Sequence, residues 1–162
     1  MDVAPLIRQA TPDDYGKLKE IIDQSFPRFY RYFALHSVTS EEGRVLVAEI
    51  QGELAGFAKL IEFKIGASKY GCILWIAVRP EVRRKGVAFN LTNASVDCLK
   101  KDGAQAVFAS TQRRNRAALA TLGRAGFMRM GFLVLRRIFG WRVFGFYREI
   151  WFAPGEVVLM HS

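Results

Sequence analysis

The sequence predicts a mixed α/β (α+β) fold, in which a central sheet of about seven strands is covered by helices on both faces. Seven segments have the length and the β-branched content of strands, and helical patterns separate several of them. One of them, residues 70–78 (YGCILWIAV), is an almost continuous apolar run, which is typical of a strand buried on both faces. The chain of 162 residues fits one domain, residues 1–162.

The N-terminal part of the chain predicts one strand and two helices. Residues 5–9 form the strand. Thr11 is a good N-cap for a helix with Pro12 in its first position, and apolar residues from Leu18 onward recur on one helical face. A second helix begins near Pro27 and is rich in aromatic side chains.

The rest of the chain predicts six strands and two helices. Strands over residues 45–50 and 54–65 flank the two-residue turn Gln51-Gly52, and strand 70–78 follows. Helices are expected over residues 86–101 and 115–124. The last three strands are expected at residues 105–110, 128–135 and 157–160.

Positive charge is concentrated in the second half of the chain. The formal net charge is +9, and residues 82–162 contain 14 Lys or Arg but only four Asp or Glu. This excess indicates a polyanionic partner, which is a nucleotide cofactor, a nucleic acid or an anionic membrane surface. A basic surface that serves solubility alone fits the composition as well, so charge does not choose among these alternatives.

Other features bear on the compartment and on metals. No apolar run reaches the ~18 residues of a membrane span, and the acidic N-terminus lacks the hydrophobic core of a signal peptide. Cys72 and Cys98 lie within apolar patterns, which favours thiols and a cytoplasmic protein. No Cys/His cluster has metal-ligand spacing, so we expect no metal.

The strongest local signal is the connection between strand 70–78 and helix 86–101. It contains Arg83, Arg84 and Lys85, followed by Gly86, and it leads directly into the helix. The first amides of a helix have no intrahelical acceptor and carry partial positive charge, so they bind phosphate oxygens. A glycine lets the backbone approach such a ligand closely. The segment from Arg83 to Ala88 therefore predicts a pyrophosphate site, against the alternative of a capped loop with three solvated bases.

Two motifs make the chain resemble the GNAT superfamily of acetyl-CoA-dependent N-acetyltransferases. The sequence R-x-x-G-x-A at residues 83–88 follows Val78 and Pro80, as in the pyrophosphate motif of that family. The second motif comprises Asn115, Ala118 and the pair Gly126-Phe127. The resemblance covers residues 6–132 and implies a mixed, mostly antiparallel sheet of about seven strands.

The resemblance also implies roles for individual residues. The backbone of Ile76, Ala77 and Val78 would pair with the pantetheine arm of acetyl-CoA, and the Val78 N–H would face the thioester carbonyl. Asn115 would contact the pantetheine arm, and Ala118 would leave room for the thiol. The cofactor-binding prediction therefore comprises Ile76, Ala77, Val78, Arg83, Arg84, Lys85, Gly86, Val87, Ala88, Asn115 and Ala118. An N-cap role is the alternative for Asn115.

The chain departs from the family in its proton-transfer groups. Where many members have a tyrosine that protonates the thiolate, this chain has Leu122, and where some have a glutamate base, it has Ser110. Glu62 is the best acidic candidate for the base, although the interpretation that it is a plain, solvated strand residue is favoured. Tyr147 is a candidate for an additional proton donor. Tyr30 and Tyr32 lie where family members build the acceptor wall, but packing explains them equally well. His36 and His161 have no visible carboxylate partner.

Residues 132–156 form an unusually long connection between the last two predicted strands. Eight aromatic residues and four arginines lie between residues 132 and 153. A long hairpin that packs aromatics into the core or against a second copy of the chain is favoured over a lid on the acceptor site. Docking on an anionic membrane or a nucleic acid is ranked lower.

The sequence thus favours an N-acetyltransferase that transfers an acetyl group from acetyl-CoA to a primary amine. That amine is a protein N-terminus, a lysine or a small molecule. Two alternatives stay open: a non-catalytic CoA-binding module, and a basic domain that docks on membrane or nucleic acid.

Overall fold

The computed structural model describes residues 4–162 and contains one seven-stranded sheet. The strand order is β1-β2-β3-β4-β5-β7-β6. The β4–β5 pair is parallel, whereas β1–β2, β2–β3, β5–β7 and β6–β7 are antiparallel. This confirms the expected mixed, mostly antiparallel sheet. The strands are β1 (Leu6–Gln9), β2 (Arg44–Ile50), β3 (Glu53–Ile65), β4 (Ser68–Val78), β5 (Val107–Gln112), β6 (Met128–Met130) and β7 (Glu156–His161).

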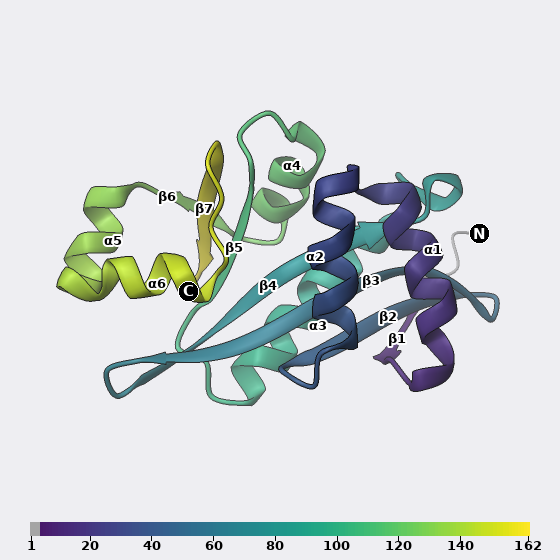
Figure 1. The fold of residues 1–162 in the computed structure, drawn as a ribbon, viewed down its shortest axis with the longest axis horizontal. Coiled ribbons are helices and arrows are strands. Elements are labelled where there is room, and N and C mark those ends of the chain that lie inside the picture. The colour runs from purple at the N-terminus through teal and green to yellow at the C-terminus, as the bar shows by residue number, and fades with distance from the viewer. Residues whose placement is uncertain (1–3) are drawn as a thin grey trace. The chain divides into compact units, whose positions relative to one another are not determined.

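Most helices lie where the sequence predicts them. They are α1 (Tyr15–Ser25), α2 (Arg28–Thr39), α3 (Val87–Lys101), α4 (Arg116–Arg124), α5 (Phe132–Phe139) and α6 (Val143–Glu149), with short 3-10 turns η1 (Pro12–Asp14), η2 (Pro80–Val82) and η3 (Gly140–Arg142). Figure 1 shows their order along the chain. None of the helices in the described part of the chain is long and apolar enough to cross a membrane.

The chain divides into two compact units. The first contains residues 4–61 and Trp75–Ser95, and the second contains Glu62–Leu74 and Val96–Ser162. Strands β3 and β4 and helix α3 each contribute residues to both units.

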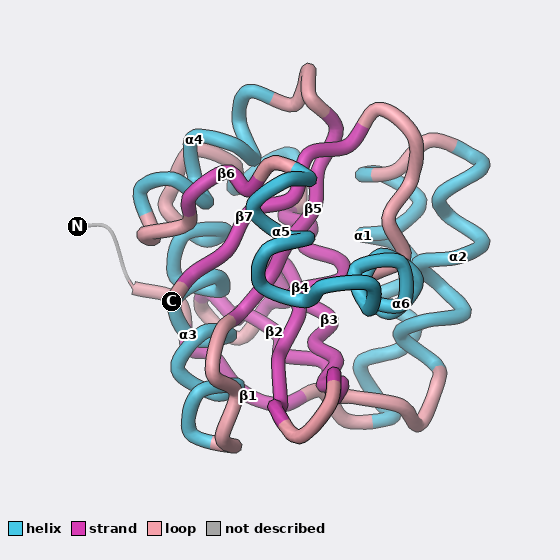
Figure 2. The backbone as a smooth tube through the Cα atoms, turned by 90° about the vertical axis from the view of Figure 1, so that its left-hand side faces the viewer, coloured by secondary structure: helices cyan, strands magenta, loops and turns pink. Residues whose placement is uncertain are grey.

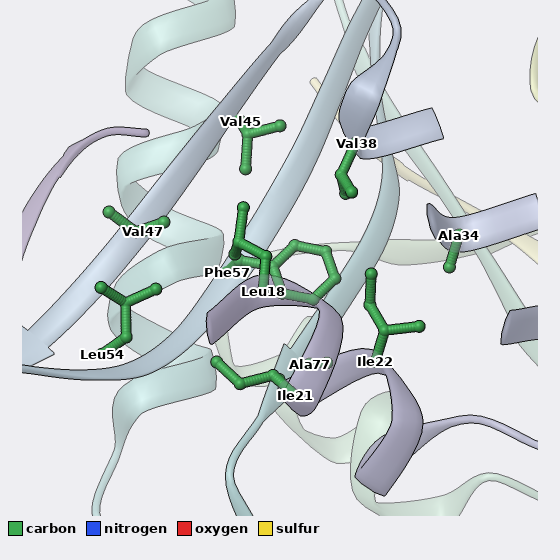
Figure 3. Packing of buried hydrophobic residues seen from close by; sticks show 10 residues of the cluster. All are labelled: Leu18, Ile21, Ile22, Ala34, Val38, Val45, Val47, Leu54, Phe57 and Ala77. Carbon is green, nitrogen blue, oxygen red and sulfur yellow. The ribbon is translucent and has the colours of Figure 1, made fainter. Parts of the chain in front are cut away.

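The core of the first unit lies between the sheet and the pair α1–α2 (Figures 1 and 3). The predicted apolar face of α1 is buried there, together with residues from α2, β2, β3 and β4. Because these side chains are removed from water, their burial favours the folded state. The cluster comprises Leu18, Ile21, Ile22, Ala34, Val38, Val45, Val47, Leu54, Phe57 and Ala77.

Helix α3 covers the other face of the sheet in the first unit (Figure 2). Strand β3 has a bulge next to this contact. Ala48 of β2 pairs with Gly56 and Glu49 pairs with Leu54, so Ala55 is an extra residue in β3. A Cβ atom at Gly56 would lie 2.6 Å from the carbonyl oxygen of Ala77, with Leu91 of α3 also close. Only a glycine therefore allows β3, the end of β4 and α3 to approach this closely.

A partly buried ion-pair cluster anchors the start of the first unit. The two terminal nitrogens of Arg8 donate to the carboxylate of Asp14 at 2.7 and 2.9 Å, and one of them also donates to Glu49 at 2.8 Å. The backbone N–H of Thr11 donates to Asp14 at 2.7 Å, which completes the predicted cap. These hydrogen bonds hold the pKa of the buried Asp14 carboxyl well below its usual range.

An aromatic core holds the second unit together. The ring of Phe108 on β5 lies 4.7 Å from that of Phe146 on α6, and Phe139 on α5 stacks on Phe146 at the same distance. Phe63 and Tyr70, at the hairpin end of β3 and β4, pack against the same rings. This core fixes α5 and α6 to the second unit.

The predicted strand over residues 128–135 is wrong in its second half. Strand β6 ends at Met130, and helices α5 and α6 replace the expected long hairpin. The buried residues of this segment recur every three or four positions, which is the period of a helix rather than of a strand. They are Leu135, Phe139, Val143, Phe146 and Ile150.

The two cysteines behave as expected. Both Cys72 on β4 and Cys98 on α3 are thiols rather than disulfide partners. Cys72 is fully buried, and burial raises the pKa of its thiol well above the usual value.

Candidate functional site

The connection between β4 and α3 forms a compact turn in the first unit. After β4 ends at Val78, the amide of Arg79 donates to the Ala55 carbonyl at 2.8 Å, and η2 follows. Arg84 and Gly86 both have positive φ angles, of 66° and 77°. Such angles are uncommon for an arginine and ordinary for a glycine, so the turn depends on Gly86 for one of its two left-handed residues.

Gly86 directly precedes α3, which begins at Val87, one residue later than the predicted helix start. The carbonyl oxygen of Gly86 accepts hydrogen bonds from the backbone N–H of Asn90 at 2.9 Å and from its side-chain Nδ2 at 3.0 Å. The amides of Val87 and Ala88 precede this first helical hydrogen bond and have no intrahelical acceptor. Helix α3 has 15 residues, so its dipole adds partial positive charge at this end.

Three basic residues directly precede Gly86 and this helix start. Arg83, Arg84 and Lys85 are all exposed. The Nε atom of Arg83 donates to the Val78 carbonyl at 3.2 Å, which ties the loop to the end of β4. Amides without an intrahelical acceptor, a helix dipole and three cations in one loop form an arrangement suited to a diphosphate.

The predicted pantetheine-binding residues occupy the last three positions of β4. Ala77 and Val78 are buried, and Ala77 belongs to the core beneath α1 and α2. The ladder between β4 and β5 comprises Gly71–Ile73 with Val107–Ala109, so it ends before Ile76. The backbone of residues 76–78 is thus not part of that ladder.

Asn115 and Ala118 lie at the start of α4, in the second unit. The Oδ1 atom of Asn115 accepts a hydrogen bond from the Ala118 N–H at 3.1 Å. The alternative of an N-cap role is therefore present in the structure. Because this cap uses only Oδ1, the side-chain NH₂ of Asn115 is not engaged in it.

The positions of the family's proton-transfer groups hold no titratable side chain here. Leu122 is buried on the inner face of α4, and Ser110 lies half-buried on β5. Their placement on α4 and β5 agrees with the predicted elements.

The two candidate catalytic side chains, Glu62 and Tyr147, differ in their surroundings. Glu62 on β3 pairs with Lys69 on β4, with Oε2 and Nζ 2.5 Å apart. Tyr147 on α6 is half-buried beside Phe132 and Phe152, and burial raises the pKa of its hydroxyl. Tyr147 therefore keeps its proton at neutral pH, as a proton donor requires.

Tyr147 also lines a cavity that the sequence did not reveal. The cavity lies within the second unit, has a volume of about 530 Å³, and includes Arg113, Arg129 and Glu156 in its wall. The carboxylate of Glu156 accepts a hydrogen bond from the Ala153 N–H at 3.0 Å. The residues come from four separate segments, so no local motif could predict this cavity.

The aromatic residues of α2 divide into two groups. Tyr30 packs edge-on against Trp75 of β4, which also contacts Phe26, with ring centroids 6.1 and 5.3 Å apart. Tyr32 is exposed and stacks on His36. The buried Nε1 atom of Trp75 lacks a hydrogen-bond partner in the described part of the chain. The sequence gives no local signal for this, because it depends on how Trp75 is packed in the folded chain.

Comparisons with known proteins agree with this fold. Residues 6–127 match the acetyltransferase (GNAT) family, so the chain belongs to that family. It is similar to N-alpha-acetyltransferase 30 of Schizosaccharomyces pombe, with 39% identity over 64 residues, which are 40% of this chain and 43% of the yeast protein. The matched part thus spans less than half of that relative.

Two solved structures show the same architecture. A GNAT-family protein from Desulfovibrio desulfuricans has a TM-score of 0.75 at 17% identity, over 98% of this chain and 99% of its own. The PaiA N-acetyltransferase of Thermoplasma acidophilum, solved in complex with coenzyme A, has a TM-score of 0.72 at 14% identity, over 99% of both chains. At these identities the likeness concerns the fold.

Proposed function

We propose that this protein transfers an acetyl group from acetyl-CoA to a primary amine. The observation that carries the proposal is the β4–α3 turn, where the left-handed Gly86 opens a long helix beside Arg83, Arg84 and Lys85. Of the possible acceptors, we put a peptide N-terminus first, because the yeast relative is named as an N-alpha-acetyltransferase. A lysine and a small-molecule amine are the other acceptors to test.

The residues of the turn fit the coenzyme. Acetyl-CoA supplies an activated acetyl thioester and a diphosphate. We assign the diphosphate to the backbone amides from Arg83 to Ala88, with the three basic side chains around them. Ile76, Ala77 and Val78 are assigned to the pantetheine arm as an added strand partner. Asn115 and Ala118 complete the assignment.

The chain's own groups would perform the remaining tasks. The Val78 N–H would donate to the thioester carbonyl oxygen, which favours attack by the amine. Tyr147 is placed before Glu62 as the proton-transfer residue, because it lines a cavity and keeps its proton. Glu62 is engaged by Lys69, which leaves it the weaker candidate for a base.

A non-catalytic CoA-binding module is the second candidate function. The observation that favours it is the presence of Leu122 and Ser110 at the positions of the family's usual proton-transfer groups. Because a thiol has a pKa of ~8.5, a thiolate leaves at neutral pH without a strong acid, so these substitutions do not exclude catalysis.

Two measurements test these functions. Calorimetry with CoA should show saturable binding by the parent protein. Release of free thiol from acetyl-CoA, followed with a panel of peptides and small amines, should depend on the acceptor. Binding without release for every acceptor would identify the binding module, and the absence of saturable CoA binding would contradict both functions.

The role of Tyr147 is tested in the same assay. A Tyr147→Phe variant should lower kcat by about 10²-fold, with little change in the affinity for CoA. The matched control is Tyr15→Phe, which removes the hydroxyl of an exposed tyrosine in the first unit that has no assigned role. An unchanged kcat in Tyr147→Phe would remove Tyr147 from the mechanism.

A further inference from the structure

Helices α5 and α6 expose a dense group of large apolar side chains. We call it the α5–α6 surface, and it includes the turn η3 between them. Leu133 and Trp141 are 76% and 75% exposed, and neighbouring positions of both helices are exposed as well. The α5–α6 surface comprises Phe132, Leu133, Val134, Ile138, Trp141 and Phe144. Monomeric proteins seldom expose such a concentration of apolar residues without a binding role.

Other positions of the same helices are already used for packing. Leu135, Phe139, Val143, Phe146 and Ile150 are buried in the second unit, and Phe139 stacks directly on Phe146. Helices α5 and α6 are therefore anchored in the second unit. The exposed side chains are not needed to complete this core, because other residues of α5 and α6 already occupy the core positions.

Arginines are interleaved with the exposed apolar residues. Arg136, Arg137 and Arg142 lie on α5 and η3 and Arg148 on α6, whereas Glu149 is the single acid between residues 132 and 153. Arg148 and Glu149 form an exposed ion pair at 3.6 Å. The guanidinium of Arg136 lies 4.8 Å from the ring centroid of Trp141, so charge and aromatic surface are presented together.

We propose that the α5–α6 surface docks on an anionic lipid bilayer. Aromatic and aliphatic side chains would enter the interface between headgroups and acyl chains, while the arginines would bind the acidic headgroups. A second copy of the chain fits less well, because a two-fold contact would bring four arginines against four arginines. A nucleic acid would match the arginines but would leave Leu133, Val134 and Ile138 without a partner.

The proposal departs from the low rank that the sequence gave to a membrane. That rank depended on a hairpin whose aromatics would be packed away, whereas the helices leave six large apolar residues of the α5–α6 surface exposed. This proposal goes beyond the proposed acetyl transfer and does not depend on it, since vesicle binding needs no coenzyme.

Vesicle co-sedimentation tests the proposal directly. The full chain is mixed with vesicles of phosphatidylcholine alone, or of phosphatidylcholine with phosphatidylglycerol. We expect binding to the anionic vesicles that weakens with added salt, and little binding to the neutral ones. Equal binding to both vesicles, or none to either, would overturn the proposal.

Two double variants separate the apolar contribution to vesicle binding from the contribution of the arginines, and a third serves as the control. Leu133→Ser with Trp141→Ser should reduce partition to anionic vesicles by at least about tenfold. Arg136→Gln with Arg137→Gln should reduce it by about fivefold per arginine. Phe29→Ser with Tyr32→Ser is the matched control, because both side chains on α2 are similarly exposed, at 70% and 72%.

Two further outcomes would also contradict the proposal. One is a control variant that loses as much binding as the α5–α6 variants. The other is a dimer of the parent, seen by light scattering, that dissociates when Leu133 and Trp141 are replaced. Circular dichroism of each variant verifies that the fold is retained.

Discussion

The Nε atom of Arg83 donates a hydrogen bond to the carbonyl oxygen of Val78, at a distance of 3.2 Å. The first of the three adjacent bases before Gly86 is thereby tied to the last residue of β4, and the chain must turn within a few residues to enter α3. Arg84 and Gly86 provide this turn through their positive φ angles. The geometry of the proposed diphosphate site thus depends on the backbone as much as on charge.

A Gly86→Ala variant should bind CoA at least about tenfold more weakly than the parent. A methyl group has room at this position, where the nearest heavy atom is the Asn90 Nδ2 at 3.7 Å. The left-handed backbone, however, costs an alanine about 1 kcal/mol, so the turn should rearrange. The measurement is calorimetry with CoA. Gly123→Ala on α4, where nothing lies within 4 Å and the backbone is helical, should leave CoA affinity unchanged.

Substitutions of Asn115 should separate its capping role from a role in coenzyme binding. Asn115→Ala removes the cap of α4 and should lower the free energy of unfolding by about 1 kcal/mol. Asn115→Asp keeps a capping oxygen but loses the NH₂ donor, so it should keep stability and weaken CoA binding. If both properties are retained in Asn115→Asp, the cap is the whole function of this residue.

A Gly56→Ala variant should be destabilised by about 2 kcal/mol. The added Cβ would lie 2.6 Å from the Ala77 carbonyl, where backbone rather than a movable side chain blocks it. Urea denaturation measures the loss. Gly16→Ala on α1, where nothing lies within 4 Å, should be neutral or slightly stabilising. Equal effects of the two substitutions would show that β3 and β4 are less closely packed than described.

The Arg8–Asp14 pair should make stability depend on pH in the acid range. The folded-state pKa of Asp14 is lowered, so its stabilisation is present above the ordinary carboxyl pKa of ~4 and is lost as the pH falls below it. Asp14→Asn should therefore cost about 2 kcal/mol at pH 7, and the difference from the parent should shrink toward pH 3. Asp23→Asn, at an exposed ion pair, should show a small difference at either pH.

Much of the fold could be predicted because local signals and the final structure agree. The cap at Thr11, the turn at Gln51-Gly52 and the buried pattern of β4 all depend on neighbours in sequence. The position of the β4–α3 loop was equally predictable, since the apolar run of β4, Gly86 and the helical pattern that follows are neighbours in the chain. The ends of β5 were displaced by two residues, because pairing with β7 rather than hydropathy decides where that strand ends.

The segment from Phe132 to Glu149 could not be predicted by composition. Its exposed aromatics hide the spacing of Leu135, Phe139 and Val143, which is helical. Reading only the buried positions would have revealed the period, but burial is a property of the folded chain. The cavity beside Tyr147 could not be predicted from the sequence either, because its wall is formed by segments that are distant in the chain.

The sequence alone thus determined the order of most elements, the glycine before α3 and the positive charge of the second half, because each depends on residues close together in the chain. Tertiary structure decided which side chains are withdrawn from water. Lys59 illustrates this: it is buried, its ammonium donates to the carbonyls of Ser40 and Glu42, and burial lowers its pKa. No local pattern marks such a lysine, since its partners lie 17 and 19 residues away in sequence.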